Sequence, residues 1–252
     1  MKLGIVGKGG VGKTTISALI AQSYVAHSKR VIAIDTDSNP NLGVSLGLTL
    51  EQSEQIPVLP RSLIVGSGVD LSPEELVAKY GHPTPAGVTL LSAIKVTEAG
   101  AGCTCGGHAT VRSLLGTALE TEADVTLVDM EAGIEHLSRS GGTLAYADIL
   151  LVVAEPTRKA VMTAARTLAL AEELGISRTY LVGNKAHLPA DKAFFTEQCE
   201  RVGLPLAGVV PFDLQVADAD RLGMSLPADH GASVRTAVDE VVNFLQEVYT
   251  AA

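Results

Sequence analysis

The sequence predicts an α/β fold in which a mostly parallel sheet of about seven or eight strands carries helices on both faces. Short apolar runs rich in β-branched residues alternate with helical patterns along the chain. Continuous apolar strands separated by helices are typical of a parallel sheet that is buried on both sides. The chain has 252 residues, with no internal repeat and no low-complexity linker. We therefore expect a single domain over residues 1–252 with one well-buried core.

Seven apolar runs are expected to form the strands. In chain order they cover residues 2–6, 30–35, 88–94, 125–129, 149–153, 179–183 and 206–210. Helical patterns cover residues 14–21, 160–174 and 192–202. The polar, proline-containing stretch 51–85 fits neither pattern and is left unassigned. Because parallel sheets bind ligands at the carboxyl ends of their strands, the residues that follow each strand are the first candidates for a functional site.

The first predicted strand leads into the sequence GKGGVGKT at residues 7–14, and a helical pattern follows at once. This is the phosphate-loop pattern G-x-x-x-x-G-K-[ST], in the strand–loop–helix context that it requires. Glycines let backbone N–H groups point inward at an anion, and the helix N-terminus adds partial positive charge. We expect Lys13 to reach the β- and γ-phosphates of a nucleotide and the Thr14 hydroxyl to hold Mg²⁺. The expected nucleotide-binding residues of the loop are Gly9, Gly10, Val11, Gly12, Lys13, Thr14 and Thr15.

Carboxylates follow two other predicted strands. Asp35 and Asp37 lie on a turn directly after the second strand, where they suit a metal ion and a water molecule. A solvated Asx turn is the structural alternative for this pair. Asp129 closes a run of four residues, as in the Walker B pattern, whose carboxylate binds Mg²⁺ through its water shell. Together with the phosphate loop, these residues predict a P-loop NTPase.

Lys8 is unusual because it lies inside the loop, where it would be repelled by the cationic phosphate site. It can act if it points outward, toward phosphates held by a second copy of the chain. With Lys8, the loop reads K-G-G-x-G-K-[ST], and the sequence resembles the deviant phosphate-loop ATPases of the MinD, ParA and nitrogenase iron protein group. The resemblance implies that Lys8 crosses a dimer interface to the partner's ATP. The expected catalytic residues are then Lys8, Lys13 and Asp37.

The same resemblance implies roles for residues at further strand ends. It implies that Asp37 orients or deprotonates the attacking water, that Asp35 helps to hold Mg²⁺, and that the N–H group of Gly133 meets the γ-phosphate. Many relatives read D-x-P-A-G after the Walker B strand, whereas this chain has Met130 and Glu131. We expect Glu131 to be repelled by the triphosphate and to point away from it, toward a dimer interface.

The adenine end of the site is expected after the sixth and seventh predicted strands. Asn184 and Lys185 follow the sixth strand, and Pro211 follows the seventh. The resemblance implies that all three are nucleotide-binding, with Asn184 contacting the adenine amino group and Pro211 bordering the base through its backbone.

Cys103 and Cys105 form a C-x-C pair among glycines. Thiolates suit soft or borderline ions such as Ni²⁺ or Zn²⁺, but a closed site needs four ligands. A twofold dimer presents the same patch twice, so two C-x-C segments would complete one four-sulfur site between subunits. The structural alternative is a pair of free thiols on a glycine-rich loop.

Three other residues of metal-ligating type are expected to have structural roles. Cys199 lies in a predicted helix and is expected to be a small buried hydrophobe. His108 is expected in the first turn of a helix, and His136 is expected to make local hydrogen bonds. Whether either histidine joins the metal site stays open.

The phosphate loop, the C-x-C pair and the run DMEAGIEHL at residues 129–137 together resemble the CooC type of ATPase. These ATPases assist nickel insertion into carbon monoxide dehydrogenase. The resemblance implies an Mg²⁺-dependent ATP hydrolase that works as a homodimer, with Ni²⁺ or Zn²⁺ between its subunits and a nickel enzyme as client. A close cousin acts on acetyl-CoA synthase, and the sequence does not separate the two clients.

Charge and composition bear on the other function classes. The formal net charge of −9 argues against a nucleic-acid surface, and the acidic stretch 234–252 argues against a membrane-binding tail. The first residues enter the phosphate loop without a cleavable signal, so we expect a cytoplasmic protein with reduced thiols. Three alternatives remain: a MinD/ParA-type positioning ATPase, an iron–sulfur electron carrier like the nitrogenase iron protein, and a passive metal store.

Overall fold

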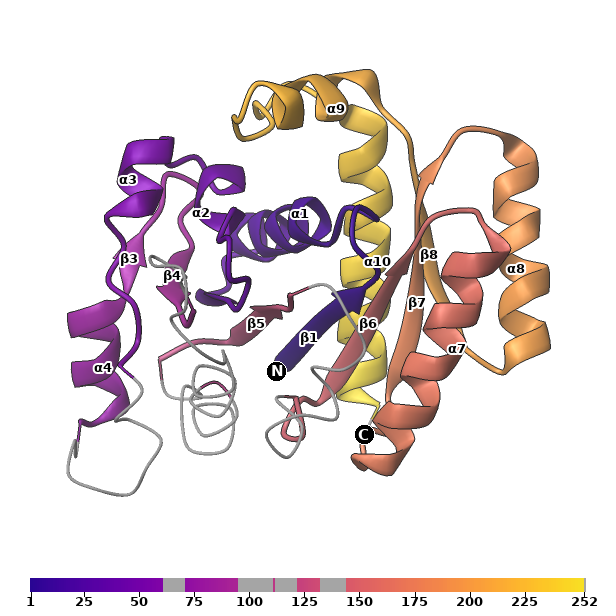
Figure 1. Ribbon diagram of the computed structural model, residues 1–252, viewed down its shortest axis with the longest axis horizontal. Helices are drawn as coiled ribbons and strands as arrows, with labels where there is room; N and C mark the ends of the chain where they lie inside the picture. The colour runs from indigo at the N-terminus through magenta and orange to yellow at the C-terminus, as the bar shows by residue number, and fades with distance from the viewer. Residues whose placement is uncertain (61–70, 95–110, 112–121, 132–143, 252) are drawn as a thin grey trace.

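The computed structural model describes residues 1–60, 71–94, 111, 122–131 and 144–251 (Figure 1). Within these residues the strands form one eight-stranded sheet in the order β3-β4-β2-β5-β1-β6-β7-β8, parallel except for the β3–β4 pair. The strands are β1 (Lys2–Gly7), β2 (Val31–Asp35), β3 (His82–Pro83), β4 (Thr89–Ser92), β5 (Val125–Asp129), β6 (Ile149–Ala154), β7 (Thr179–Ala186) and β8 (Leu206–Pro211). The expected α/β fold with a mostly parallel sheet is confirmed.

Helices lie on both faces of this sheet (Figure 1). The described helices are α1 (Lys13–Ala26), α2 (Leu42–Ser45), α3 (Leu50–Glu54), α4 (Pro73–Tyr80), α7 (Arg158–Glu173), α8 (Pro189–Val202), α9 (Leu214–Arg221) and α10 (Ala232–Thr250). Each face has its own hydrophobic core among the described residues. One core joins α1 and α10 to the sheet, and the other joins α4, α7 and α8 to it.

Alternation along the strands explains why both cores form. Leu3 and Ile5 of β1 enter the core beneath α1, whereas Val6 enters the core beneath α7. A strand that is buried on both faces needs apolar residues at every position, which is the pattern that the sequence shows. Cys199 is buried in the second core, and burial raises the pKa of its thiol to about 11. Its expected role as a small hydrophobe is confirmed.

The stretch 51–85, which matched no pattern, contains ordered elements in its described part. Helix α4 begins after Ser72, whose side chain accepts a hydrogen bond from the N–H group of Glu75. The Glu75 side chain in turn accepts a hydrogen bond from the N–H group of Ser72, so the two form a capping box. Pro73 occupies the first helical turn, where it fits well. This start signal could have been found from the sequence. The two-residue strand β3 could not have been found in this way, because two residues are too few to show the alternating pattern of a strand.

Candidate nucleotide site

The phosphate loop connects β1 to α1, and its glycines adopt backbone conformations that other residues avoid. Gly12 has φ +90° and caps the N-terminus of α1. A Cβ atom on Gly12 would lie 2.5 Å from the side-chain nitrogen of Asn184, so the position admits only glycine without rearrangement. Helix α1 begins directly at Lys13, and its first-turn N–H groups have no partner within the helix. The loop therefore presents donors and partial positive charge at one point.

Lys13 is a buried lysine surrounded by carboxylates. The residue is 7% exposed, and its Nζ donates to the carbonyl oxygen of Lys8 at 3.4 Å. Burial lowers the pKa of Lys13, while Asp129, Asp37 and Glu131 act in the opposite direction. A cation that is buried among three carboxylates has its charge balanced within the chain and is aimed into the site where phosphates are expected.

Asp35 and Asp129 occupy matching positions at the carboxyl ends of β2 and β5. Asp35 accepts hydrogen bonds from the N–H groups of Asp37 and Leu42, both at 3.0 Å. Asp129 accepts from the Ser17 hydroxyl at 2.9 Å. Burial raises the pKa of both carboxyl groups, and the Asp129 charge raises that of Asp35 further. A cation bound to these two buried carboxyl groups would offset the repulsion between them.

The donor set here suits Mg²⁺, which prefers carboxylate, hydroxyl and phosphate oxygens and keeps several waters. The side chain of Thr14 bonds to Asp129 and lowers the pKa of that carboxyl group, so the expected hydroxyl and carboxylate are together. Within the described ranges there is no cluster of three or more histidine, cysteine or acidic side chains able to hold a metal by themselves. An ion at Asp35 and Asp129 would therefore be completed by hydroxyl, water and phosphate oxygens.

A cavity of about 670 Å³ runs from the phosphate loop to the end of β8. This volume lies in the usual range for small-molecule and cofactor pockets. The expected site residues that line it are Gly9, Gly10, Gly12, Lys13, Thr14, Thr15, Asp37, Asn184, Lys185 and Pro211. The structure therefore brings the phosphate end and the expected adenine end of the site into one cavity.

Two expected loop residues lie outside the lining of this cavity. Val11 belongs to the core beneath α1, and its carbonyl oxygen accepts a hydrogen bond from Asn184. Lys8 is exposed to solvent. Five other candidates, namely Cys103, Cys105, His108, Gly133 and His136, lie outside the described residues.

Residues after β6 and within β7 brace the phosphate loop from the side. The Asn184 side chain is buried and donates to the Val11 carbonyl oxygen at 2.8 Å. Lys185 has φ +56°, and its Nζ donates to the Gly10 carbonyl oxygen at 2.6 Å and pairs with Glu155 at 3.0 Å. Asn184 and Lys185 thus contact the loop itself. Glu155 was missed in the sequence, although it follows β6 at the edge where functional residues were sought.

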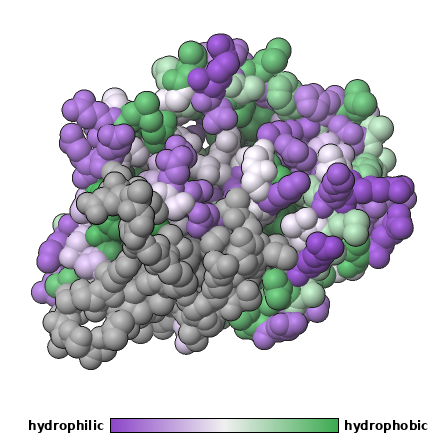
Figure 2. Space-filling view, viewed as in Figure 1, coloured by the Kyte–Doolittle hydropathy of each residue, from purple (hydrophilic) through white to green (hydrophobic). Residues whose placement is uncertain are grey.

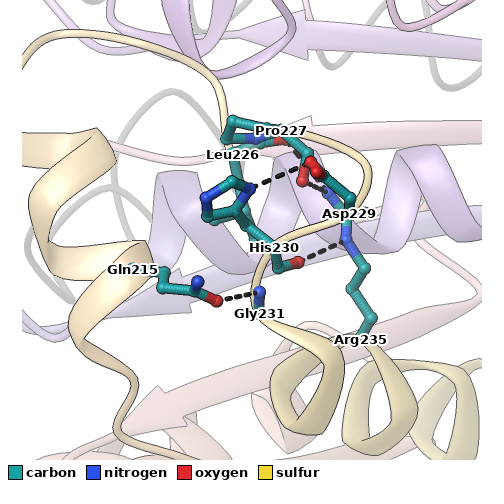
Figure 3. Close-up of polar contacts among 7 residues, drawn as sticks. All are labelled: Gln215, Leu226, Pro227, Asp229, His230, Gly231 and Arg235. Carbon is teal, nitrogen blue, oxygen red and sulfur yellow. Dashed lines mark hydrogen bonds and ion pairs between the residues drawn. The ribbon is translucent and has the colours of Figure 1, made fainter.

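Arg235 holds the far wall of the cavity, which consists of α9 and the segment that follows it (Figure 3). Its guanidinium group donates to the carbonyl oxygens of Leu226, Pro227 and His230, each at 3.0 Å. It also donates to the Gln22 side chain of α1 at 3.2 Å. No short sequence pattern marks this arginine, because three of these four partners are backbone carbonyls.

A second bond ties the same wall to the start of α10. The N–H group of Gly231, which has φ +65°, donates to the Gln215 side chain of α9 at 2.8 Å (Figure 3).

Figure 2 shows hydrophobic and hydrophilic side chains mixed at the top of the molecule, over α9. The exposed hydrophobic residues of this region include Leu214, Leu222 and Met224.

Glu131 lies outside the lining of the cavity, and its expected place toward a dimer interface stays a prediction. Its carboxylate accepts a hydrogen bond from the Ser38 hydroxyl at 2.7 Å, and its charge opposes the lowering of the Lys13 pKa by burial. The hydroxyl donor on the neighbouring segment holds the carboxylate within the chain.

A parallel sheet with this loop after its first strand, a buried lysine and two strand-end carboxylates defines a P-loop NTPase. Over residues 5–226 the chain matches the family described as the CobQ/CobB/MinD/ParA nucleotide binding domain. The chain belongs to this family and is an ATPase.

The relatives that match most of the chain include two that are more than 30% identical to it. The carbon monoxide dehydrogenase accessory protein CooC of Rhodospirillum rubrum is 36% identical over 242 residues, with 89% of each chain covered. An uncharacterized ATP-binding protein of Methanocaldococcus jannaschii is 32% identical over an alignment of 259 residues, with 97% of each chain covered. A chain of the MinC:MinD cell division protein complex of Aquifex aeolicus has a TM-score of 0.74 at 21% identity, covering 98% of this chain and 95% of that one. The last likeness shows the shared fold.

Proposed function

We propose that this ATPase is a maturation factor that inserts nickel into carbon monoxide dehydrogenase. The observation that carries the proposal is the 36% identity to CooC across 89% of both chains. The C-x-C pair at Cys103 and Cys105 supports it, because an insertion factor needs a site for its ion. Acetyl-CoA synthase is the alternative client. A cytoplasmic location fits this role, and the described residues include no helix long and apolar enough to cross a membrane.

The nucleotide chemistry follows from the residues at the strand ends. Lys13 holds the β- and γ-phosphates, while Thr14, Asp35 and Asp129 hold Mg²⁺ directly or through water. When bound, Mg²⁺ neutralises charge that develops on the phosphate oxygens. Asp37 lines the cavity and orients the attacking water, with Gly133 as a γ-phosphate contact. The braces from Asn184 and Lys185 keep the loop in its binding shape.

The homodimer is the second part of the proposal. Lys8 is exposed within the phosphate loop and reaches the nucleotide of a partner subunit. One ion held by two C-x-C pairs would also join the two subunits. ATP and the ion then favour the same assembly, so each should strengthen the binding of the other. Hydrolysis removes the γ-phosphate contacts and lets the sulfur site open toward the client.

Metal binding by the cysteine pair tests this proposal. We expect the protein to take up about one Ni²⁺ or Zn²⁺ per two chains in equilibrium dialysis, and the Cys103→Ala/Cys105→Ala variant to take up none. Cys199→Ala is the matched control, because this thiol is buried in the core and should not contribute. Unchanged uptake in the double variant would exclude the C-x-C site.

Nickel transfer tests the client. Apo carbon monoxide dehydrogenase incubated with Ni²⁺, ATP and the protein should gain activity, and the Lys13→Ala variant should fail to support the gain. Apo acetyl-CoA synthase in a parallel reaction distinguishes the two clients. Activation of neither enzyme would contradict a role in nickel insertion.

A MinD/ParA-type positioning ATPase is the second candidate, favoured by 31% identity to the septum site-determining protein MinD of Thermotoga maritima over 68% of this chain. The last helix argues against a membrane version. The apolar face of α10, which includes Val238, Val242 and Leu245, is buried in the core with α1 and the sheet. Those side chains already have a packing partner within the chain. Binding to anionic vesicles would reverse this preference.

A further inference from the structure

Glu131 lies two residues beyond Asp129 and bonds twice to the segment that follows β2. Its N–H group donates to the Thr36 hydroxyl at 3.3 Å, and its carboxylate accepts from the Ser38 hydroxyl at 2.7 Å. The two segments are separated by more than 90 positions in the chain. They adjoin here because β2 and β5 are neighbours in the sheet.

Thr36 continues the contact between the two segments beyond the ends of the strands. Its N–H group and its hydroxyl both donate to the carbonyl oxygen of Asp129, at 3.1 and 2.9 Å. The residue is completely buried. Thr36 therefore fixes one side of Asp37 to the end of β5, and Ser38 fixes the other side through Glu131.

Asp37 itself is held by local bonds that do not determine where the turn lies. Its N–H group donates to Asp35, and its carboxylate accepts from the N–H group of Asn39 at 2.9 Å. These bonds shape the turn from within. The position of the turn relative to Lys13 and Asp129 depends on its attachments to the neighbouring segment, which are Thr36 and Ser38.

The charges of this region give the Ser38–Glu131 bond a second consequence. Asp37, Asp129 and Glu131 all act on the charge of Lys13. A γ-phosphate bound at Lys13 would bring further negative charge near these carboxylates. Because Glu131 is bonded to Ser38, a shift of Glu131 moves the Asp37 turn as well.

We propose that Glu131 is a positioning residue for ATP hydrolysis, which acts through its hydrogen bond from Ser38 to hold Asp37 in register with the end of β5. The inference rests on the proposed role of Asp37 in hydrolysis and is independent of the nickel client. It also gives a physical role to a residue that departs from the D-x-P-A-G pattern.

Four variants test the bond: Ser38→Ala, Glu131→Ala, the double variant and Glu131→Gln. We expect each alanine variant to lower kcat for Mg-ATP hydrolysis about tenfold while KM changes less than about threefold. The reason is that ATP still binds in the ground state, whereas the alignment of Asp37 with the end of β5 is lost. The double variant should be no slower than Glu131→Ala, since Ser38→Ala breaks a bond that Glu131→Ala has already removed. Glu131→Gln keeps an acceptor and should retain most of kcat. Glu172→Ala, at an exposed position on α7, is the matched control and should match the wild type.

Three outcomes would overturn the inference: multiplicative losses in the double variant, a Glu131→Gln variant as slow as Glu131→Ala, or a rise of KM with kcat unchanged. Binding of ADP within about threefold of wild type shows that each variant is folded. Asp37→Ala separates this inference from the function it rests on. Full hydrolysis by Asp37→Ala would refute the role of Asp37, whereas an inactive Asp37→Ala with an unaffected Ser38→Ala would refute the coupling alone.

Discussion

Asp35 and Asp129 lie directly opposite each other on the parallel strands β2 and β5, and both carboxyl groups are almost completely buried. Burial raises the pKa of both, and the charge of Asp129 raises that of Asp35 further. Without a cation, the folded chain therefore keeps protons on these two carboxyl groups at pH values where the unfolded chain would release them. The same repulsion that costs stability here is what makes this end of the sheet receptive to a divalent ion.

We predict that the free energy of unfolding of the nucleotide-free protein falls as the pH rises from about 4 toward neutral. The sign follows from the raised pKa values: over this range the folded chain keeps protons that the unfolded chain has lost, and raising the pH favours the state with fewer protons. Urea unfolding curves at several pH values measure the slope. The Asp35→Asn variant should show a weaker fall, and the difference between the two slopes cancels all other groups. Equal slopes would contradict the assignment.

The same pair predicts that Mg²⁺ with ADP stabilises the protein more at about pH 8 than at about pH 5, because the ion must displace protons at the lower pH. Thermal unfolding with and without the ligands at both pH values measures this. The Asp35→Asn variant should lose most of the pH dependence. A stabilisation that does not change with pH would show that the pair is not the ion's site.

The Lys185 brace predicts a loss of nucleotide affinity. Lys185→Met removes the donor to the Gly10 carbonyl oxygen and should weaken ADP binding about tenfold, because a charge-assisted bond that shapes the loop is lost. Glu155→Gln should weaken binding less than about fivefold, since its ion pair with Lys185 is more than one-third exposed. Calorimetric titration with ADP measures both.

Lys192→Met, at an exposed position on α8, is the control for the lost charge. If Lys185→Met binds ADP as tightly as this control does, the bond to Gly10 contributes nothing to the binding shape of the loop.

The Arg235 contacts predict a loss of stability together with a change at the nucleotide site. Arg235→Met removes the guanidinium donor to the carbonyl oxygens of Leu226, Pro227 and His230, of which only that of Pro227 keeps a backbone donor in the described part of the chain, and should cost about 2 kcal/mol of unfolding free energy. KM for ATP should rise, because the α9 wall loses its link to α1. Urea unfolding and steady-state kinetics measure the two effects.

Arg235→Lys should recover only part of each effect, because an ammonium group cannot reproduce the fork of donors. Gln215→Ala breaks the neighbouring bond to Gly231 and leaves Arg235 intact, so it should raise KM with a smaller loss of stability. An Arg235→Met variant with wild-type stability and KM would show that the wall holds its position without the arginine.

The exposed position of Lys8 predicts a defect confined to assembly. Lys8→Ala should bind ATP with about wild-type affinity but should not form the ATP-dependent dimer, because its charge acts on the partner's phosphates. Light scattering at several protein concentrations measures the dimer, with Lys29→Ala as an exposed control. A normal ATP dimer in Lys8→Ala would refute this role.

The apolar runs predicted seven of the eight strands in the described part of the chain because a strand buried on two faces has no polar positions to interrupt it. The phosphate loop, Asp35 and Asp129 were predictable for a related reason: each follows directly on such a run. The sequence did not predict the contribution of α9, α10 and Arg235 to the site. Their contribution depends on where the chain returns to the sheet in the folded molecule.

Local patterns of the sequence were enough for the fold class and the phosphate loop, because both are encoded in short contiguous segments. The pairing of Asp35 with Asp129, the reach of Lys185 to Gly10 across 175 positions and the bond between Ser38 and Glu131 across 93 positions became visible in the folded molecule. These contacts depend on strand order, which places β2 beside β5 and β6 between β1 and β7. Strand order follows from the packing of the whole chain, so no single segment contains it.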